Sequence, residues 1–169
     1  MIKKENDYKN TKKPDKVDKN EENEKISWKA GNMLYPLPAV MVSLTDREGR
    51  SNIITLAWAG TICTNPPMLS VSIRPERYSY DIIKETGEFV VNLTTKALTR
   101  ATDYCGVTSG RNVDKFKEMR LTKLESEKIK AVAIAESPVN IECKLRQVME
   151  LGSHSLFIAD VVNVRVDGK

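Results

Sequence analysis

Histidine and cysteine are scarce in this sequence. It contains one histidine, His154, and three cysteines among 169 residues. One histidine and no GxSxG pattern disfavour the nucleophile, base and orienting group of a hydrolase. Cys63, Cys105 and Cys143 lie about forty residues apart, which fits neither a disulfide framework nor a CxxC metal site. Reduced thiols in a cytoplasmic protein are the better interpretation.

Other absences exclude further classes of protein. No window reaches the roughly 18 uninterrupted apolar residues of a membrane helix, and the N-terminus lacks the apolar core of a secretory signal. No GxGxxG motif occurs, which disfavours a Rossmann domain. The net charge is +4, but lysines and acids alternate, so the basic stripe of a nucleic-acid-binding surface is missing. We expect neither a membrane nor a nucleic-acid partner.

Residues 1–25 differ in composition from the rest of the chain. Lys, Asn, Asp and Glu dominate, and eight lysines against seven acids leave the segment nearly neutral. Such a segment cannot bury enough apolar surface to offset the entropy of ordering it, so we predict a disordered charged tail. Residues 26–169 have the length and apolar content of one folded domain.

The folded part is predicted to be mainly β. Runs of branched residues with period-two alternation, separated by turn residues, indicate strands. Short helices are expected at 79–86, after Thr94 or Thr95, and within 113–119, while 121–135 reads as a surface connection. Hairpin connections between most strands predict an antiparallel barrel with a few short helices. The expected strands are Ala39–Thr45, Ser51–Ala59, Met68–Ile73, Glu88–Leu93, Val139–Glu150 and Ser155–Val166.

The stretch from Ser51 to Ser79 is predicted to form one wall of a pocket. Its last residues, Arg77-Tyr78-Ser79, open a short helix, and a helix start offers free backbone N–H groups to a phosphate. Arg77 could add a bidentate charged contact and Ser79 a hydroxyl. A capped helix with a surface arginine would show the same pattern.

Small polar residues surround Trp58 in the same stretch. A tryptophan in a strand is more often part of the core than a ligand platform. Small residues let a planar ligand approach the backbone, and these are unusually small for the middle of a barrel: Thr55, Ala57, Thr61, Cys63 and Thr64. The pattern suggests a flat ligand without specifying one.

His154 lies in the predicted turn between the last two strands. It could be an exposed turn residue with no function. With no cysteine or histidine nearby, it does not predict a zinc site.

Taken in order, these motifs resemble the flavin reductase-like domain, the FMN-binding split barrel, and within it the flavoredoxins. The likeness runs from about Met33 to Asp167, and the order and spacing of the motifs carry it. The matching pieces are Tyr35-Pro36 with Pro38, Asn52 through Trp58, Pro66-Pro67, Arg77-Tyr78-Ser79, Gly87-Glu88-Phe89 with Asn92, Ser109-Gly110-Arg111, Asp114-Lys115-Phe116, Glu142-Cys143, and His154 with Phe157-Ile158.

The resemblance implies a homodimer that holds FMN noncovalently near the subunit interface. By position, one group of residues would lie against the isoalloxazine ring, a second would bind the phosphate and ribityl chain, and a third would lie near the flavin, from the same chain or its partner. His154 matches a histidine close to the flavin and the nicotinamide site. The three groups are Thr55, Leu56, Ala57 and Trp58; Arg77, Tyr78 and Ser79; and Ser109, Arg111 and Lys115.

The implied activity is that of an FMN-binding oxidoreductase that takes electrons from NAD(P)H or from a redox protein partner. Relatives usually continue beyond the position of Lys169, so a shorter end is expected to affect flavin affinity. The alternative is a non-catalytic flavin-binding or dimerisation module.

Overall fold

The structure is a computed structural model that describes residues 25–168. The chain divides into two units, Met1–Met33 and Leu34–Lys169. The described part of the first unit, residues 25–33, contains no helix or strand. The tail predicted over residues 1–25 lies, apart from its last residue, outside the described residues.

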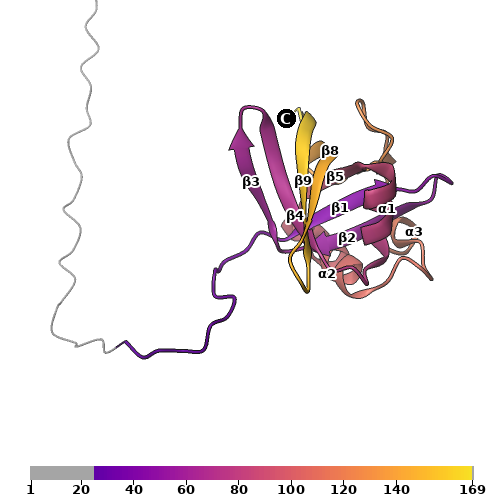
Figure 1. Ribbon diagram of the computed structural model, residues 1–169. Helices are drawn as coiled ribbons and strands as arrows, with labels where there is room; N and C mark the ends of the chain where they lie inside the picture. Colours follow the sequence, from indigo (N-terminus) through magenta and orange to yellow (C-terminus); the bar gives the residue numbers. More distant parts are fainter. Residues whose placement is uncertain (1–24, 169) are drawn as a thin grey trace, which may run out of the picture. The chain divides into compact units, whose positions relative to one another are not determined.

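Seven strands form one antiparallel sheet in the second unit (Figure 1), in the order β2-β1-β5-β8-β9-β4-β3. The predicted mainly antiparallel β fold is therefore confirmed. A second sheet consists of two short strands, β6 (Lys123–Leu124) and β7 (Ala133–Ile134). The strands of the large sheet are β1 (Val40–Thr45), β2 (Ser51–Leu56), β3 (Ala59–Thr64), β4 (Pro67–Ile73), β5 (Glu88–Leu93), β8 (Val139–Glu150) and β9 (Ser155–Val166).

The two edges of this sheet, β2 and β3, follow each other directly in the chain. Within the described residues they do not pair with each other, so the barrel is open between them. The backbone N–H of Ser72 donates to the carbonyl of Trp58 at 2.9 Å and ties the start of β3 to the end of β4. The end of β2 therefore lies across this opening from the loop that follows β4.

Alternation along β1 and β2 directs side chains to two separate cores. Val42 and Ile54 face the barrel interior, where they join the buried ring of Phe157. Met41 and Ile53 face the other side, which helices cover. Because both faces of these strands are buried, their apolar residues run nearly without interruption.

Four short helices complete the unit. Helix α1 (Tyr78–Thr86) ends at Gly87, whose φ of 70° is the left-handed conformation that glycine adopts most easily. A 3-10 turn, η1 (Lys96–Leu98), is capped by the predicted Thr95 and leads into α2 (Thr99–Val107). The last, α3 (Lys115–Glu118), is capped by the side chain of Asp114.

Two sequence predictions are corrected by the strand boundaries. The second strand ends at Leu56 rather than Ala59, and Thr61, Cys63 and Thr64 belong to β3, at the sheet edge rather than in the middle of a barrel. A continuous apolar run hid this break. The segment 121–135 is also more than a surface connection, because it forms β6 and β7 and buries Ala131, Ala133 and Ile134.

Candidate functional site

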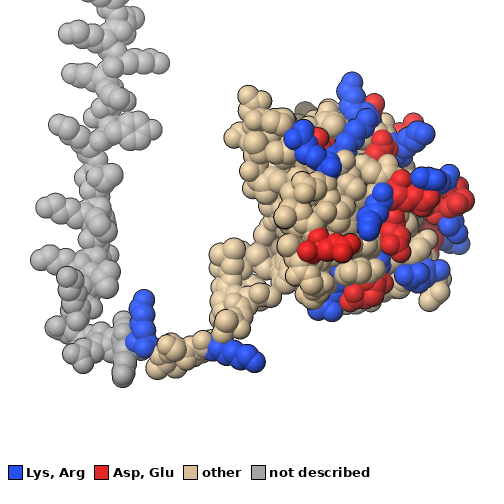
Figure 2. Space-filling model, viewed as in Figure 1, with Lys and Arg blue, Asp and Glu red and all other residues tan. Residues whose placement is uncertain are grey.

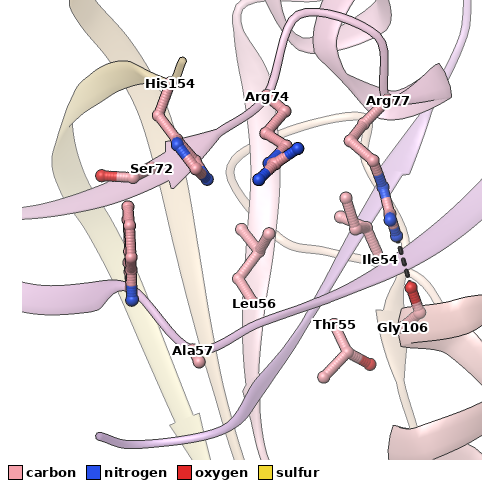
Figure 3. Close-up of a pocket in the computed structure, with 10 residues that line it drawn as sticks. Ile54, Thr55, Leu56, Ala57, Ser72, Arg74, Arg77, Gly106 and His154 are labelled. Carbon is pink, nitrogen blue, oxygen red and sulfur yellow. Dashed lines mark hydrogen bonds between the residues drawn. The ribbon is translucent and has the colours of Figure 1, made fainter. Parts of the chain in front are cut away.

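A pocket of about 220 Å³ lies at the opening between β2 and the loop after β4. Ile54 and Leu56 belong to one wall, and the side chains of Arg74, Arg77 and His154 point toward them from the other side (Figure 3). The pocket thus has an apolar wall opposite a basic one. Its lining residues are Ile54, Thr55, Leu56, Ala57, Trp58, Ser72, Arg74, Arg77, Gly106 and His154.

Trp58 and His154 form the aromatic rim of this pocket. Their ring centroids are 4.4 Å apart and the ring planes are tilted by 36°. Trp58 keeps 38% of its surface exposed, so it does not belong to the core. Nδ1 of His154 lies 3.0 Å from the hydroxyl of Ser153. The histidine of the β8–β9 turn is therefore brought to the same pocket as the end of β2.

A second, smaller pocket of about 120 Å³ continues from the first. Both are lined by Ile54 and Arg77, so they form one elongated hollow. The start of α1 contributes Tyr78 and Ser79 to the second pocket. Because the first backbone N–H groups of a helix have no partner within the helix, this end of the hollow favours an anion.

Arg77 is held at the junction of the two pockets. Its Nη2 donates to the backbone carbonyl of Gly106, at the end of α2 (Figure 3). Arg77 occupies the N-cap position of α1, but its side chain does not cap the helix. The guanidinium is thereby fixed in the hollow with further N–H donors available.

Lys115 lies at the base of the second pocket and is only 2% exposed. Its Nζ donates to the carbonyls of Ile53 at 2.6 Å and Cys105 at 2.9 Å. Burial lowers the pKa of this ammonium to about 8, and the positive charge of Arg77 also lowers it. Burial likewise raises the pKa of the Cys105 thiol to about 11. At pH 7 Lys115 is therefore protonated and the neighbouring Cys105 thiol is neutral.

The loop after α2 approaches β2 unusually closely. A Cβ on Gly110 would lie 2.1 Å from Oδ1 of Asn52, so only glycine fits without movement. Nδ2 of Asn52 in turn donates to Oγ of Ser79 at 2.9 Å. These contacts between loop, strand and helix enclose the end of the hollow that favours an anion.

The structure gathers most of the sequence-predicted site residues along this hollow. Thr55, Leu56, Ala57, Trp58, Arg77 and His154 line the first pocket, and Tyr78, Ser79, Ser109 and Lys115 line the second. Arg111 lies just outside, with its guanidinium carbon 5.3 Å from the centre of the Tyr78 ring. The hydroxyl of Thr55 points away from the hollow and donates to the carbonyl of Thr102 at 2.5 Å.

Sequence reasoning missed Arg74, Gly106 and the role of Asn52. Arg74 forms an ion pair with Glu76 at 3.3 Å. The backbone N–H of Glu76 itself, followed by Arg74, holds the pKa of this carboxyl below its usual value. The signal available for Arg74 was its position directly after a predicted strand, β4, which borders the opening. Gly106 and Asn52 act through long-range contacts that have no local sequence signal.

The chemistry of the hollow favours binding and orientation over bond cleavage by side chains. Among residues 25–168, no group of three or more His, Cys, Asp or Glu could hold a metal ion. No helix within the same range is long and apolar enough to cross a membrane. The hollow offers a first pocket with an apolar wall, a basic wall and an aromatic rim, and a second pocket whose helix start favours an anion.

The profile of the flavin reductase-like domain matches residues 32–169. The chain belongs to this family. Because the match covers most of the chain, the family resemblance drawn from the motifs is confirmed.

Solved flavoredoxins share this flavin reductase-like fold. The flavoredoxin of Desulfovibrio vulgaris (Miyazaki F) is 39% identical, with a TM-score of 0.80 over 86% of this chain and 78% of that one. Flavoredoxin from Methanosarcina acetivorans is 29% identical, with a TM-score of 0.79 over 86% and 76%. An uncharacterized protein of Archaeoglobus fulgidus is 34% identical over 78% of this chain and 73% of its own length.

Proposed function

We propose that this flavin reductase-like protein binds FMN noncovalently and acts as an oxidoreductase with NAD(P)H as electron donor. The observation that carries the proposal is the elongated hollow, in which a pocket with an apolar wall and an aromatic rim leads to a pocket at the start of α1, as a flat ring system joined to a phosphate would require. The likeness to two flavoredoxins supports a flavin as the ligand.

The residues of the hollow fit FMN along its whole length. Leu56 and Ala57 would lie against the isoalloxazine ring, while the backbone of Thr55 is available to the ring edge because its hydroxyl is engaged elsewhere. The N–H groups at the start of α1, with Arg77, would bind the phosphate. The close approach of Gly110 to Asn52 shapes the wall at that end.

Bound FMN would supply the hydride and electron transfer, which requires no acid–base side chain of the protein. The chain's own part is to hold the ring at the opening between β2 and β4. Trp58 and His154 stand at the rim of this pocket and are placed to contact a nicotinamide. Arg74 adds positive charge on the basic wall.

A homodimer is part of the proposal. No charged residue occurs between Ser51 and Ile73, and the face of the folded unit over β3 and β4 is almost free of Lys, Arg, Asp and Glu (Figure 2). Ile62 in β3 is 47% exposed. Exposed edge strands are normally protected by charge, so an uncharged one favours coverage by a second copy. A redox protein is the other partner that such a face could take.

The reducing cytoplasm is the proposed location. Cys63, Cys105 and Cys143 are all free thiols, which is the usual state of cysteine in that compartment.

A stopped-flow experiment tests the activity directly. Rapid mixing of the FMN-loaded protein with NADH, and separately with NADPH, should bleach the flavin absorbance if the protein is a reductase. An unchanged spectrum with both nucleotides would contradict NAD(P)H dependence. The remaining candidates would then be a carrier reduced by another protein and a non-catalytic flavin-binding module.

A further inference from the structure

Arg74 is a cation of the hollow that the proposed placement of FMN does not use. It lines the first pocket, where the ring would lie, but not the second pocket, where the phosphate would bind. Arg77 lines both pockets and serves that phosphate. The oxidised isoalloxazine ring is uncharged, so it offers Arg74 no anion. The charge of Arg74 is therefore available to a second ligand.

The position of Arg74 is on the wall that also carries His154. Both side chains point toward the wall of Ile54 and Leu56 (Figure 3), so a ring lying against Leu56 would have them on its open side. His154 is also next to Trp58, with ring centroids 4.4 Å apart. A nicotinamide dinucleotide carries its diphosphate one ribose away from the nicotinamide ring. A donor that meets this rim thus brings two negative charges to the wall of Arg74.

A single ion pair holds Arg74 in the structure. Its Nη1 lies 3.3 Å from Oε1 of Glu76, and no other acidic residue pairs with it among residues 25–168. The guanidinium has five N–H donors, so most of them remain available. The two side chains are 56% and 64% exposed, and ion pairs this exposed are weak. A diphosphate can therefore displace the carboxylate of Glu76.

The backbone that carries this pair is fixed independently of the two side chains. The N–H of Arg77 donates to the carbonyl of Arg74 at 3.1 Å, which closes the turn into α1. Pro75 restricts φ at the centre of that turn. Changing the side chain at position 74 or 76 leaves these constraints in place. Such variants therefore change the charge at the rim and keep the path of the chain.

The reduced flavin ring is the other anion that Arg74 could meet. Glu76 counters the charge of Arg74 as long as the pair is intact, which weakens its effect on the ring. A diphosphate differs because it can form two parallel hydrogen bonds to a guanidinium and take the place of the carboxylate. The exposed position of Arg74 at the pocket rim therefore favours an incoming ligand over the ring.

We propose that Arg74 binds the diphosphate of the nicotinamide dinucleotide, and that Glu76 competes with this diphosphate for the guanidinium. The inference rests on the proposed function, and it divides the two arginines of the hollow: Arg77 serves FMN and Arg74 serves the electron donor. NADH and NADPH share the diphosphate, so the contact serves both alike. The additional phosphate of NADPH is the other source of this chemistry.

Binding of NAD⁺ and NADP⁺ to the FMN-loaded protein tests the proposal without turnover. Calorimetry gives their dissociation constants for the wild type, Arg74→Ala, Glu76→Gln and the double variant. We expect Arg74→Ala to weaken both nucleotides by about tenfold, the lower end for a hydrogen bond to a charged group. Glu76→Gln should tighten both by about two- to threefold, the scale of an exposed ion pair. This gain should vanish in the Arg74→Ala background, where the carboxylate has no arginine to occupy.

Arg47 and Glu85 provide the matched control. They form another exposed arginine–glutamate pair, at 3.0 Å, and line neither pocket. Arg47→Ala and Glu85→Gln should bind NAD⁺ like the wild type. A second control uses 1-benzyl-1,4-dihydronicotinamide, a hydride donor without phosphate. Bleaching of the bound flavin by this donor should suffer less from Arg74→Ala than bleaching by NADH does.

Four outcomes would overturn the inference. They are an NAD⁺ affinity unchanged in Arg74→Ala, a loss for NADP⁺ alone, a gain from Glu76→Gln that persists without Arg74, and an equal loss with the phosphate-free donor. The third would show that Glu76 repels the donor directly, and the fourth that Arg74 acts on the reduced flavin.

The same measurements separate this inference from the proposed function. A wild type that fails to bind FMN contradicts both. A wild type that holds FMN but binds neither nucleotide contradicts the inference and the NAD(P)H dependence, and leaves FMN binding in place. Nucleotide binding that is insensitive to Arg74 rejects the inference alone.

Discussion

Asn52 in β2 donates a hydrogen bond from Nδ2 to Oγ of Ser79, the second residue of α1, at 2.9 Å. Both side chains are buried. Gly110 packs against the other side of the same asparagine. One buried amide therefore sets the distance between the strand, the helix start and the loop that together surround the proposed phosphate site.

Gly110→Ala should weaken FMN binding by about tenfold or more, because the new Cβ would lie 2.1 Å from Oδ1 of Asn52 and must displace it. Fluorescence titration measures the change. Gly31→Ala is the control, since its Cβ would make only an ordinary contact at 3.9 Å. The combined Asn52→Ala/Gly110→Ala variant should lose less than the sum of the single losses. A wild-type affinity for FMN in Gly110→Ala would show that this contact does not shape the FMN site.

Arg77→Ala should weaken FMN by about 1.5–3 kcal/mol, the scale of a hydrogen bond to a charged group. Arg77→Lys should recover part of the loss, since it keeps the charge without the planar fork. Riboflavin, which lacks the phosphate, should lose less affinity than FMN when Arg77 is replaced by alanine. Arg47→Ala, at an exposed pair with Glu85, is the control. An unchanged FMN dissociation constant in Arg77→Ala would place Arg77 outside the site.

Glu142→Gln should destabilise the protein by about 2 kcal/mol at pH 7. The buried carboxylate accepts the backbone N–H groups of Glu127 at 3.0 Å and Lys128 at 2.8 Å, and an amide N–H of Asn163 at 3.1 Å. Burial alone would raise the pKa of Glu142, but these donors hold it below its usual value.

A carboxyl whose pKa is lowered on folding contributes stability above its unfolded pKa and loses it as the pH falls. In urea unfolding, the difference in the free energy of unfolding between the wild type and Glu142→Gln should therefore shrink as the pH drops below about 4.5. A difference that stays constant from pH 7 to pH 3 would show that the ionised carboxylate is not the stabilising group.

Lys115 should also make the stability of the protein depend on pH, but through a cation whose pKa is lowered on folding. Its pKa is about 8 in the folded protein against 10.5 for an unperturbed lysine, so between these values the unfolded chain binds more protons. The free energy of unfolding of the wild type, relative to Lys115→Met, should rise by about 1–2 kcal/mol over this interval. Denaturant titrations at pH 7.5, 9 and 10.5 measure it, and a difference that is flat or falls with pH would contradict the assignment.

Ile62→Lys should shift the proposed dimer toward monomer, because it places a charge on the exposed, uncharged edge strand β3. Sedimentation equilibrium measures the association. Leu151→Lys, at an apolar position of 63% exposure in the β8–β9 turn, is the control and should leave the association unchanged. A wild type that sediments as a monomer at every concentration would contradict the proposed dimer.

Local sequence patterns were sufficient for much of the fold. The bounds of β8 and β9 match the predicted strands because period-two alternation continues up to the turn that separates them. Gly87 and Thr95 mark helix ends that depend on their own backbone and side-chain chemistry. These elements could be predicted because neighbouring residues determine them.

The site could be predicted only in part, because some of its residues come together from distant parts of the chain. Thr55–Trp58 and Arg77–Ser79 are continuous segments, so their motif could be recognised before their separation in space was known. Arg74 and Asn52 become site residues only once β2, β4 and the loop at Gly110 are brought together. The break after Leu56 was hidden because small and apolar residues continue through it.

The central claim is that the elongated hollow binds FMN. The most direct test is to incubate the purified protein with FMN, remove free flavin by gel filtration, and record the visible spectrum before and after adding NADH. The account predicts that flavin absorbance stays with the protein and is bleached by NADH. Protein that emerges without flavin at every FMN concentration would contradict it.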